Sequence, residues 1–522
     1  MNMQQAVLSG TACCFMLANI AFSALSIGVG RGKIIKKVRG VFMEANKLLG
    51  LEPKTVFTYF EKLCTIPHGS GNTRAISDYL VSFAEENGIC CIQDELGNLL
   101  LFTDGTPGYE DHPPVILQGH IDMVCEKAAD CPIDMEKEGL DVTHDGEWVF
   151  ARGTTLGGDN GIAVAYIMAL LMDKMIPHPP IEAILTVDEE IGMEGADGID
   201  LSQLKGRTML NLDSEEEGIF TVSCAGGIRA TIHLPVERRV VYGPCVKLTV
   251  EGLEGGHSGI EIHKNRGNAN KIMGQFLDRV QEMMPLCITK LQGGSKDNAI
   301  PRSCEVTLVA MGMHLERINA VAEKLQEEIR TQYDAPNAVV RGDDVDALGG
   351  NALTTESTAK VIALLNAAPD GVQSWSEDID GLVQTSLNLG IAELKDGLEL
   401  TFALRSSVDR EKKALLERLE ELAQFYNGSL DSTGDYPAWE YVKDSRLRDI
   451  MIQVYSQMFD QAPKVVAIHA GLECGLLSKK LPGLDCVSIG PDMQDIHTCR
   501  ERLNIASTER IWRFIKEILR QL

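Results

Sequence analysis

The sequence is poor in basic residues, and this shortage narrows the partners that the protein can have. Its 522 residues include 49 lysines and arginines against 75 aspartates and glutamates, which gives a formal net charge of −26. A surface of that charge repels nucleic acid and anionic membranes but attracts divalent cations. We therefore expect no nucleic-acid partner and no stable membrane association. Most of these carboxylates serve only to keep the surface soluble.

The sequence also lacks the cysteine spacing of a disulfide framework or a thiolate metal site. Fourteen cysteines are present, yet none forms a Cys-x-x-Cys pair. Several, such as Cys245, Cys304 and Cys486, lie within apolar runs, where a free thiol packs as a small hydrophobic group. We expect reduced thiols and a cytoplasmic location.

The first 42 residues lack acidic side chains altogether. Five basic residues fall between Arg31 and Arg39, after an uncharged and moderately apolar stretch from Ala6 to Gly30. That stretch is long enough to span a bilayer, but small polar residues dilute it and no basic segment precedes it, as a signal peptide requires. We expect residues 1–42 to be a disordered extension. A membrane anchor and an export signal are the alternatives.

From Met43 onward, short apolar strands alternate with amphipathic helices, and the chain is long enough for two or three domains. Strands are expected at 114–118, 183–187, 208–212 and 486–489, and helices at 56–64, 73–87 and 161–174. This pattern predicts an α/β fold with a central mixed or parallel sheet, whose functional residues collect at the carboxyl ends of strands. We expect this domain to be discontinuous, formed by residues 43–225 and 436–522.

The intervening segment, residues 226–435, contains an internal repeat. A helix, two strands and a second helix are expected at 269–283, 287–291, 304–311 and 315–330. The same order recurs at 358–367, 381–389, 397–404 and 410–425. We therefore expect an inserted α+β domain built of two similar units.

Polar side chains follow several of the expected strands. His120 and Asp122 end the first strand, and a period of two places both on one side of it. The run Asp188-Glu189-Glu190 follows the second strand, and Asp213 follows the third. Buried carboxylates in such a run are costly unless a positive charge offsets them.

Two further segments add to this set. The turn Gly157-Gly158-Asp159-Asn160-Gly161 opens a helix, and Ser488-Ile489-Gly490-Pro491 leads toward His497. Taken singly, each motif has a structural explanation, such as a strand-end cap or an Asx turn. Taken together, they present His, Asp and Glu to one edge of a sheet. That set suits zinc, manganese or cobalt bound by nitrogen and oxygen ligands without thiolate.

The order of these motifs resembles that of the aminoacylase/glutamate-carboxypeptidase clan of dinuclear metallopeptidases, and within it the bacterial Xaa-His dipeptidase family. The resemblance runs from about Met43 to the C-terminus and implies two divalent metal ions, most simply zinc, and small peptide substrates. It implies that His120 and Asp213 are terminal ligands of different ions, with Asp159 bridging them. Glu190 would complete the shell of the first ion and His497 that of the second.

The same resemblance implies roles in catalysis. Glu189 would be the general base, and Asp122 would orient the ligating histidine. The inserted domain would act as a lid. From it, His257, in the segment Glu254-Gly-Gly-His257-Ser-Gly, would stabilise the oxyanion of the reaction. Relatives carry a cis peptide just after the bridging aspartate, so we expect Asp159–Asn160 to be cis.

Substrate-binding residues are implied less directly. A free substrate carboxylate calls for a guanidinium fork, which Arg405 would provide, with Asn298 and Arg302 nearby. The glycine-bounded segment that holds His469 and Gly471 would line the pocket. One chain would supply both lid residues to its own site, so activity should not require a homodimer, although one could form.

Two alternatives remain open from the sequence. Another hydrolase of the same clan, such as a tripeptidase, an aminoacylase or a carboxypeptidase, would have the same metal site. From a different class, the chain could be a catalytically silent binder of peptide or metal. Such a protein would be expected to have lost a ligand or the base, and here all of them are present.

Overall fold

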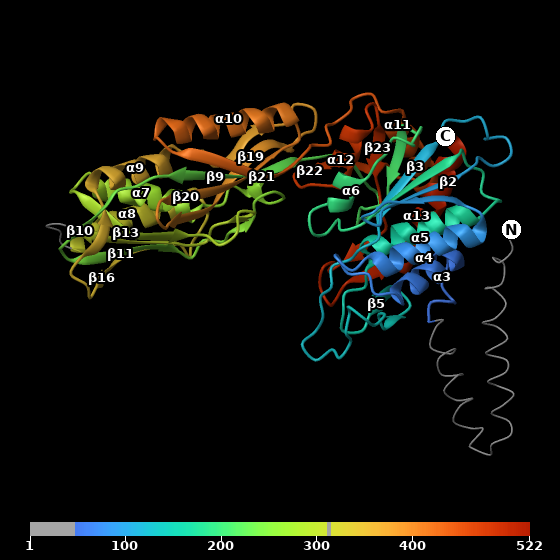
Figure 1. Ribbon diagram of the computed structural model, residues 1–522, viewed down its shortest axis with the longest axis horizontal. Coiled ribbons are helices and arrows are strands. Elements are labelled where there is room, and N and C mark those ends of the chain that lie inside the picture. The colour runs from blue at the N-terminus through green and yellow to red at the C-terminus, as the bar shows by residue number, and fades with distance from the viewer. Residues whose placement is uncertain (1–46, 311–314) are drawn as a thin grey trace, which may run out of the picture.

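The computed structural model describes residues 47–310 and 315–522, so the extension at residues 1–42 lies outside the described residues. The first of two large sheets is mixed and eight-stranded, in the order β1-β2-β6-β3-β7-β23-β8-β22 (Figure 1). Its strands, in that order, are Cys90–Gln93, Leu99–Thr103, Ile181–Thr186, Val115–His120, Thr208–Asn211, Asp485–Ser488, Ile219–Cys224 and Lys464–Ile468. Strands β6, β3, β7 and β23 are parallel, which confirms the predicted fold class.

Helices cover both faces of this sheet because successive side chains of its buried strands point to opposite faces. Leu117 of β3 packs with one group of helices, and its neighbour Ile116 packs with the other. The first group is α3 Lys54–Cys64, α4 Arg74–Asn87, α5 Gly158–Met172, α11 Arg446–Phe459 and α13 Ile505–Gln521, and the second is α6 Glu194–Gly198 and α12 Glu473–Lys480. The helices expected at 56–64, 73–87 and 161–174 correspond to α3, α4 and α5, with ends that differ by at most three residues.

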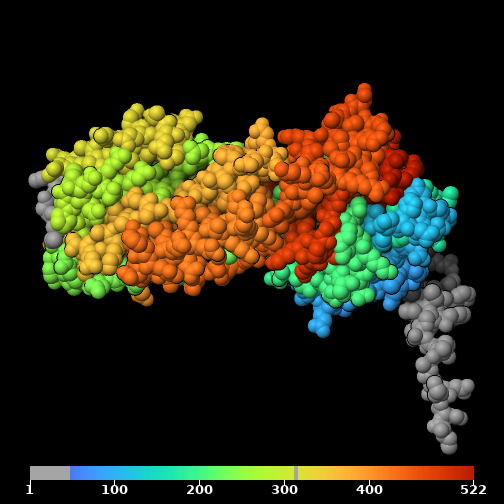
Figure 2. Space-filling model, turned by 90° about the horizontal axis from the view of Figure 1, so that it is seen from above, coloured from blue at the N-terminus to red at the C-terminus, as the bar shows by residue number. Residues whose placement is uncertain are grey.

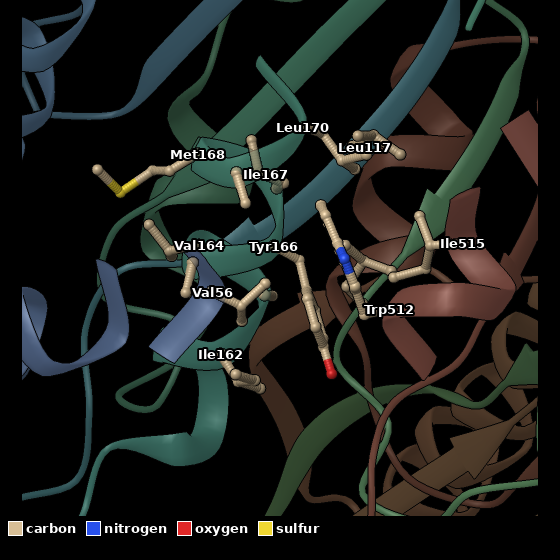
Figure 3. Close-up of a cluster of buried hydrophobic side chains, with 14 of the residues drawn as sticks. Val56, Leu117, Ile162, Val164, Tyr166, Ile167, Met168, Leu170, Trp512 and Ile515 are labelled. Atoms are coloured by element: carbon tan, nitrogen blue, oxygen red, sulfur yellow. The ribbon is translucent and has the colours of Figure 1, made fainter. Parts of the chain in front are cut away.

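Helix α5 is apolar on all sides because it is enclosed on all sides. Every residue from Ile162 to Leu170 is at most 1% exposed. Figure 3 shows its side chains between Val56 of α3, Leu117 of β3 and Trp512 of α13. The Tyr166 ring stacks on Trp512 with centroids 6.0 Å apart. The N-terminal end of α5, which carries Asp159, is therefore attached to a closely packed core.

The second large sheet has nine strands and forms a separate lobe, at the left in Figure 1. Eight of them follow the order β16-β11-β15-β13-β19-β20-β9-β21, namely Val339–Val345, Cys245–Glu251, Cys304–Ala310, Leu286–Gly293, Val383–Leu394, Leu398–Ser406, Gly226–Leu234 and Ser429–Tyr436, and β18 Gly371–Trp375 pairs with β19. Figure 2 shows from above that the two lobes give the molecule an elongated outline.

The second sheet confirms the predicted internal repeat. Helices α7 Ala269–Gln281, α8 Leu315–Gln332, α9 Thr355–Ala367 and α10 Asp409–Phe425 share one hydrophobic core on one face of it. The half β13-β15-β11-β16 has the same order of elements as the half β19-β20-β9-β21, with α7 and α8 in the first and α9 and α10 in the second. The halves meet where β13 pairs with β19.

Short elements complete the structure. They are the pairs β10 Arg238–Val241 with β17 Gly350–Leu353 and β12 Gly256–His257 with β14 Ala299–Ile300, the small sheet of β4 Val142–His144, β5 Trp148–Ala151, β24 Met493–Gln494 and β25 Arg502–Asn504, and the 3-10 turn η1 Ile262–Lys264. Within 47–310 and 315–522, no helix is long and apolar enough to cross a membrane. All cysteines in those ranges are free thiols, as expected.

Candidate metal centre

The expected metal ligands come from separate elements that meet at one edge of the first sheet. His120 is the last residue of β3, and Asp213 lies two residues beyond β7, which pairs with β3 in parallel. Glu190 follows β6, the parallel neighbour on the other side of β3. Asp159 is in the first turn of α5, and His497 lies in the loop between β24 and β25. Parallel strands bring their carboxyl ends to the same edge, so the ligands converge there.

Asp159 is at the middle of this group. Its Oδ1 lies 3.2 Å from His120 Nε2, which is also 3.5 Å from Asp213 Oδ1. Its Oδ2 lies 3.2 Å from His497 Nε2, which is also 2.8 Å from Glu190 Oε1. Each carboxylate oxygen of Asp159 therefore faces the Nε2 atom of one imidazole, and each of these Nε2 atoms contacts one further carboxylate. The Asp159–Asn160 peptide is cis, as expected.

These contacts favour a different division of the ligands from the one expected. The expectation separated His120 from Asp213, whereas their side chains are in contact because β3 and β7 are adjacent strands. Likewise, His497 contacts Glu190 rather than Asp213. The ligand atoms of His120, Asp159 and Glu190 also lie within 4.8 Å of one another. The His120–Asp213 and His497–Glu190 contacts, at 3.5 and 2.8 Å, are shorter than this span.

The electrostatics of the cluster follow from crowding buried acids against two imidazoles. Burial raises the pKa of Asp159, but hydrogen bonds from His120 and His497 outweigh it and hold that pKa below its usual range. Burial raises the pKa of Asp213 to about 6. Hydrogen bonds to Asp159 and Glu190 raise the pKa of His497 to about 10. Such a cluster shares protons among its members, and a divalent cation would displace them.

Asp122 and Glu189 lie beside the ligands. His120 donates through Nδ1 to the Asp122 carbonyl oxygen at 3.0 Å, and Oδ1 of Asp122 is 3.3 Å from the same nitrogen. The Asp122 carboxylate also accepts hydrogen bonds from the Ser70 hydroxyl and from the backbone N–H groups of Glu189 and Glu190. Burial raises the pKa of the Glu189 carboxyl well above its usual range.

A second cluster gathers His257, Arg405 and His469 around Gly259. A Cβ atom added to Gly259 would lie 2.9 Å from His257 Cε1 and 3.1 Å from Arg405 Nε. His257 Nδ1 accepts the backbone N–H groups of Gly259 and Ile260 at 3.1 and 3.2 Å, which leaves its proton on Nε2. Burial, followed by the charge of Arg405, lowers the pKa of His257. His257 is therefore a neutral hydrogen-bond donor.

The Arg405 guanidinium has an N–H donor without a hydrogen-bond partner among the described residues. Its Nη1 donates to the Tyr436 hydroxyl at 3.0 Å, while its Nε is buried without a partner among the described residues. His469 Nε2 lies 2.7 Å from the Ser386 hydroxyl, and its Nδ1 likewise has no partner in the described part of the chain. Burial, followed by the charge of Arg405, lowers the pKa of His469 to about 3. The Arg405 Nε–H is thus a buried donor that an anion would satisfy.

The remaining expected residues lie around this cluster. Asn298 lines two cavities, one of about 960 Å³ with His257 and Arg302, and one of about 260 Å³ with Arg405. A Cβ atom added to Gly471 would lie 2.8 Å from the Tyr436 ring. Within the described residues, 47–310 and 315–522, no hydrogen bond or ion pair joins this second cluster to the metal-ligand cluster.

Two buried acids near the ligands were not assigned roles from the sequence. Glu473 of α12 accepts hydrogen bonds from Gln118 Nε2 at 2.6 Å and from the Thr186 hydroxyl at 2.7 Å. Burial raises its pKa to about 7. Glu501 accepts hydrogen bonds from the turn that precedes Asp159. The sequence around Glu473 was expected only to line the pocket, and nothing in the spacing around Glu501 distinguishes it from a surface acid.

Known proteins resemble this chain over most of its length. The model of "Peptidase family M20/M25/M40" matches residues 116–521. The chain is 37% identical to the cytosol non-specific dipeptidase of Escherichia coli (strain K12), over 91% of this chain and 99% of that protein. The crystal structure of aminoacylhistidine dipeptidase from Vibrio alginolyticus superposes with a TM-score of 0.86 and 35% identity, over 91% of this chain and 98% of that one. Aminopeptidase PepT from Bacillus cereus shares the fold, with a TM-score of 0.51 at 14% identity.

Proposed function

Because the chain belongs to the peptidase family M20/M25/M40, we propose that it hydrolyses dipeptides, Xaa-His and others, at two divalent cations. The observation that carries this proposal is that each oxygen of Asp159 faces a separate imidazole–carboxylate pair. Two imidazoles and three carboxylates without thiolate suit zinc, with manganese or cobalt as alternatives.

The contacts assign the ligands to two sets that share Asp159. His120 and Asp213 would hold one ion, and Glu190 and His497 would hold the other. Ions held there would supply Lewis-acid chemistry, which would lower the pKa of a bound water and polarise the scissile carbonyl.

Glu189 is proposed as the general base. Its raised pKa suits a carboxylate that takes a proton from the attacking water and passes it to the leaving amine. Its backbone N–H donates to Asp122, which also contacts His120. Asp122 would therefore fix the base and the ligating imidazole relative to each other.

Residues 226–435 are proposed to act as a lid that carries groups for the substrate. The Nε2–H of His257 would donate to the oxyanion that forms as water adds to the carbonyl. The free Nε of Arg405, with Nη2 on the same edge of the guanidinium, would bind the substrate carboxylate in a bidentate pair. Asn298, Arg302, His469 and Gly471 would line the pocket for the rest of a short peptide.

The relatives support this reading. The Escherichia coli protein is named a cytosol non-specific dipeptidase, and the Vibrio alginolyticus protein is named an aminoacylhistidine dipeptidase. The chain covers nearly the whole length of both. The first name also supports the proposed cytoplasmic location.

A substrate panel tests the proposal. The purified protein, with zinc and with a chelator, would be assayed on dipeptides including Xaa-His, on tripeptides and on N-acyl amino acids. We expect turnover of dipeptides that the chelator abolishes and that added metal restores. Preference for tripeptides or N-acyl amino acids would assign the chain to another activity of the family. Metal binding without turnover of any compound would indicate a binder.

A further inference from the structure

Glu501 has an unusual set of partners for a buried acid. It is 3% exposed and precedes β25 directly. Its Oε2 accepts the backbone N–H groups of Leu156 at 2.7 Å and Gly157 at 3.1 Å. Its Oε1 accepts those of Gly158 at 2.8 Å and Asp159 at 3.3 Å. Four consecutive backbone donors, ending at the bridging aspartate, thus point at one carboxylate.

The local backbone accounts for this arrangement. Gly157 has a φ of 69°, in the left-handed region that glycine adopts at little cost. Its conformation turns the successive N–H groups to the same side, and together with the N-terminus of α5 they form a concave site for an anion. Without Glu501, these donors would be buried next to the ligands with no acceptor, which is unfavourable for each of them.

We infer that Glu501 is a positioning residue of the metal centre, an inference that rests on the proposed function. Its side chain holds the turn that carries Asp159, and its backbone belongs to the loop that carries His497. The Glu501 N–H donates to the Thr498 carbonyl at 3.0 Å, which keeps that loop folded next to His497. One residue therefore fixes the bridging carboxylate relative to the imidazole that contacts its Oδ2.

The hydrogen-bond pattern makes the position selective for a carboxylate. All four partners are donors, so each oxygen of Glu501 must accept. Glutamine would place an amide NH₂ against two N–H groups, whereas aspartate would keep two accepting oxygens on a shorter side chain. The expected order of metal affinity is therefore wild type, then Glu501→Asp, then Glu501→Gln.

Glu182 offers a matched control. It is 5% exposed and accepts the backbone N–H groups of Lys205 and Gly206 at 2.9 to 3.1 Å. It lies near the start of β6, at the opposite end of the strand from the metal ligands. Glu182→Gln therefore weakens a buried carboxylate acceptor of two backbone N–H groups, rather than four, without touching the centre.

The experiment is a zinc titration of the metal-free full chain against a chromophoric chelator, with circular dichroism to verify folding. We expect two equivalents bound by the wild type and by Glu182→Gln with equal affinities. In Glu501→Gln, the affinity for one equivalent should fall at least tenfold, and Glu501→Asp should lie between them. If Glu501→Gln does not fold, the aspartate variant decides.

The outcomes separate this inference from the proposed function. If a folded Glu501→Gln protein binds both equivalents of zinc as tightly as the wild type, the positioning role alone is overturned. The same result in a folded Glu501→Asp protein counts in its place where the glutamine variant does not fold. An equal loss of zinc affinity in Glu182→Gln also overturns the positioning role, because it shows that losing any buried acceptor weakens zinc binding. A wild type that binds fewer than two equivalents overturns the proposed metal centre and this inference with it.

Discussion

Glu189 and Glu190 are adjacent in sequence yet have different surroundings. Both backbone N–H groups donate to Asp122, but the Glu190 carboxylate contacts His497 at 2.8 Å, whereas burial raises the pKa of the Glu189 carboxyl well above its usual range. We expect Glu189→Gln to keep both metal ions and to lose turnover by about 10²- to 10⁴-fold, because an amide cannot accept the proton of water. Glu190→Gln should instead lose metal. Metal content and dipeptide turnover, measured on the same samples, check both statements. Metal loss in the Glu189 variant, or its near-normal turnover, would reverse the assignment.

Single residues also show how far the sequence could predict the site. His120, Asp213 and Glu190 could be predicted to lie together because each comes at or just after the end of a short apolar strand. Their proposed division between two ions could not be predicted, because it depends on which strands are neighbours in the sheet. Glu473 and Glu501 received no roles for a related reason. Their partners lie more than 280 residues away in the chain, and several are backbone N–H groups that carry no side-chain signal.

At the level of elements, the repeat in the second sheet was predictable because its helices have a clear apolar face and its strands alternate. The pairing of β13 with β19, which joins the two halves, was not. Near that junction, Asp370 accepts hydrogen bonds from the Leu389 N–H and the Asn268 side chain through Oδ1. Burial raises the pKa of Asp370 to about 6.

This shift predicts a pH-dependent stability of the second sheet. The folded pKa of Asp370 lies above the unfolded value of about 3.9. The stabilisation that the protonated Asp370 gives the folded state is therefore complete below about pH 4 and is lost as the pH rises through about 6. Asp370→Asn keeps the accepting oxygen and removes the charge. We expect it to raise the free energy of unfolding at pH 7.5 by up to about 3 kcal/mol and to leave it unchanged at pH 4.

Thermal unfolding at the two pH values measures this effect. Asp344→Asn, which removes an exposed carboxylate from β16, serves as the control for a change of one charge. It should have the same small effect at both pH values. If Asp370→Asn also changes the free energy of unfolding equally at pH 4 and pH 7.5, the pKa of Asp370 is not raised in the folded protein.

At the level of the whole molecule, the question is whether one chain completes its own site. His257 and Arg405 meet around Gly259 within one chain, and His469, which follows β22 of the first sheet, contacts Ser386 of the second. We therefore expect no exchange of catalytic groups between subunits, even if the protein forms a homodimer. A mixture of a His257→Ala chain with a Glu189→Gln chain should show no more activity than the two variants measured separately. Substantial recovery on mixing would mean that sites are shared across a subunit interface.

The central claim is that two metal ions share Asp159, and crystallography at the zinc absorption edge tests it most directly. Crystals of the zinc-loaded protein should give two anomalous peaks on either side of the Asp159 carboxylate. One peak should lie against His120 and Asp213, and the other against Glu190 and His497. A single peak, or two peaks that place His120 with Glu190 and Asp213 with His497, would contradict the account.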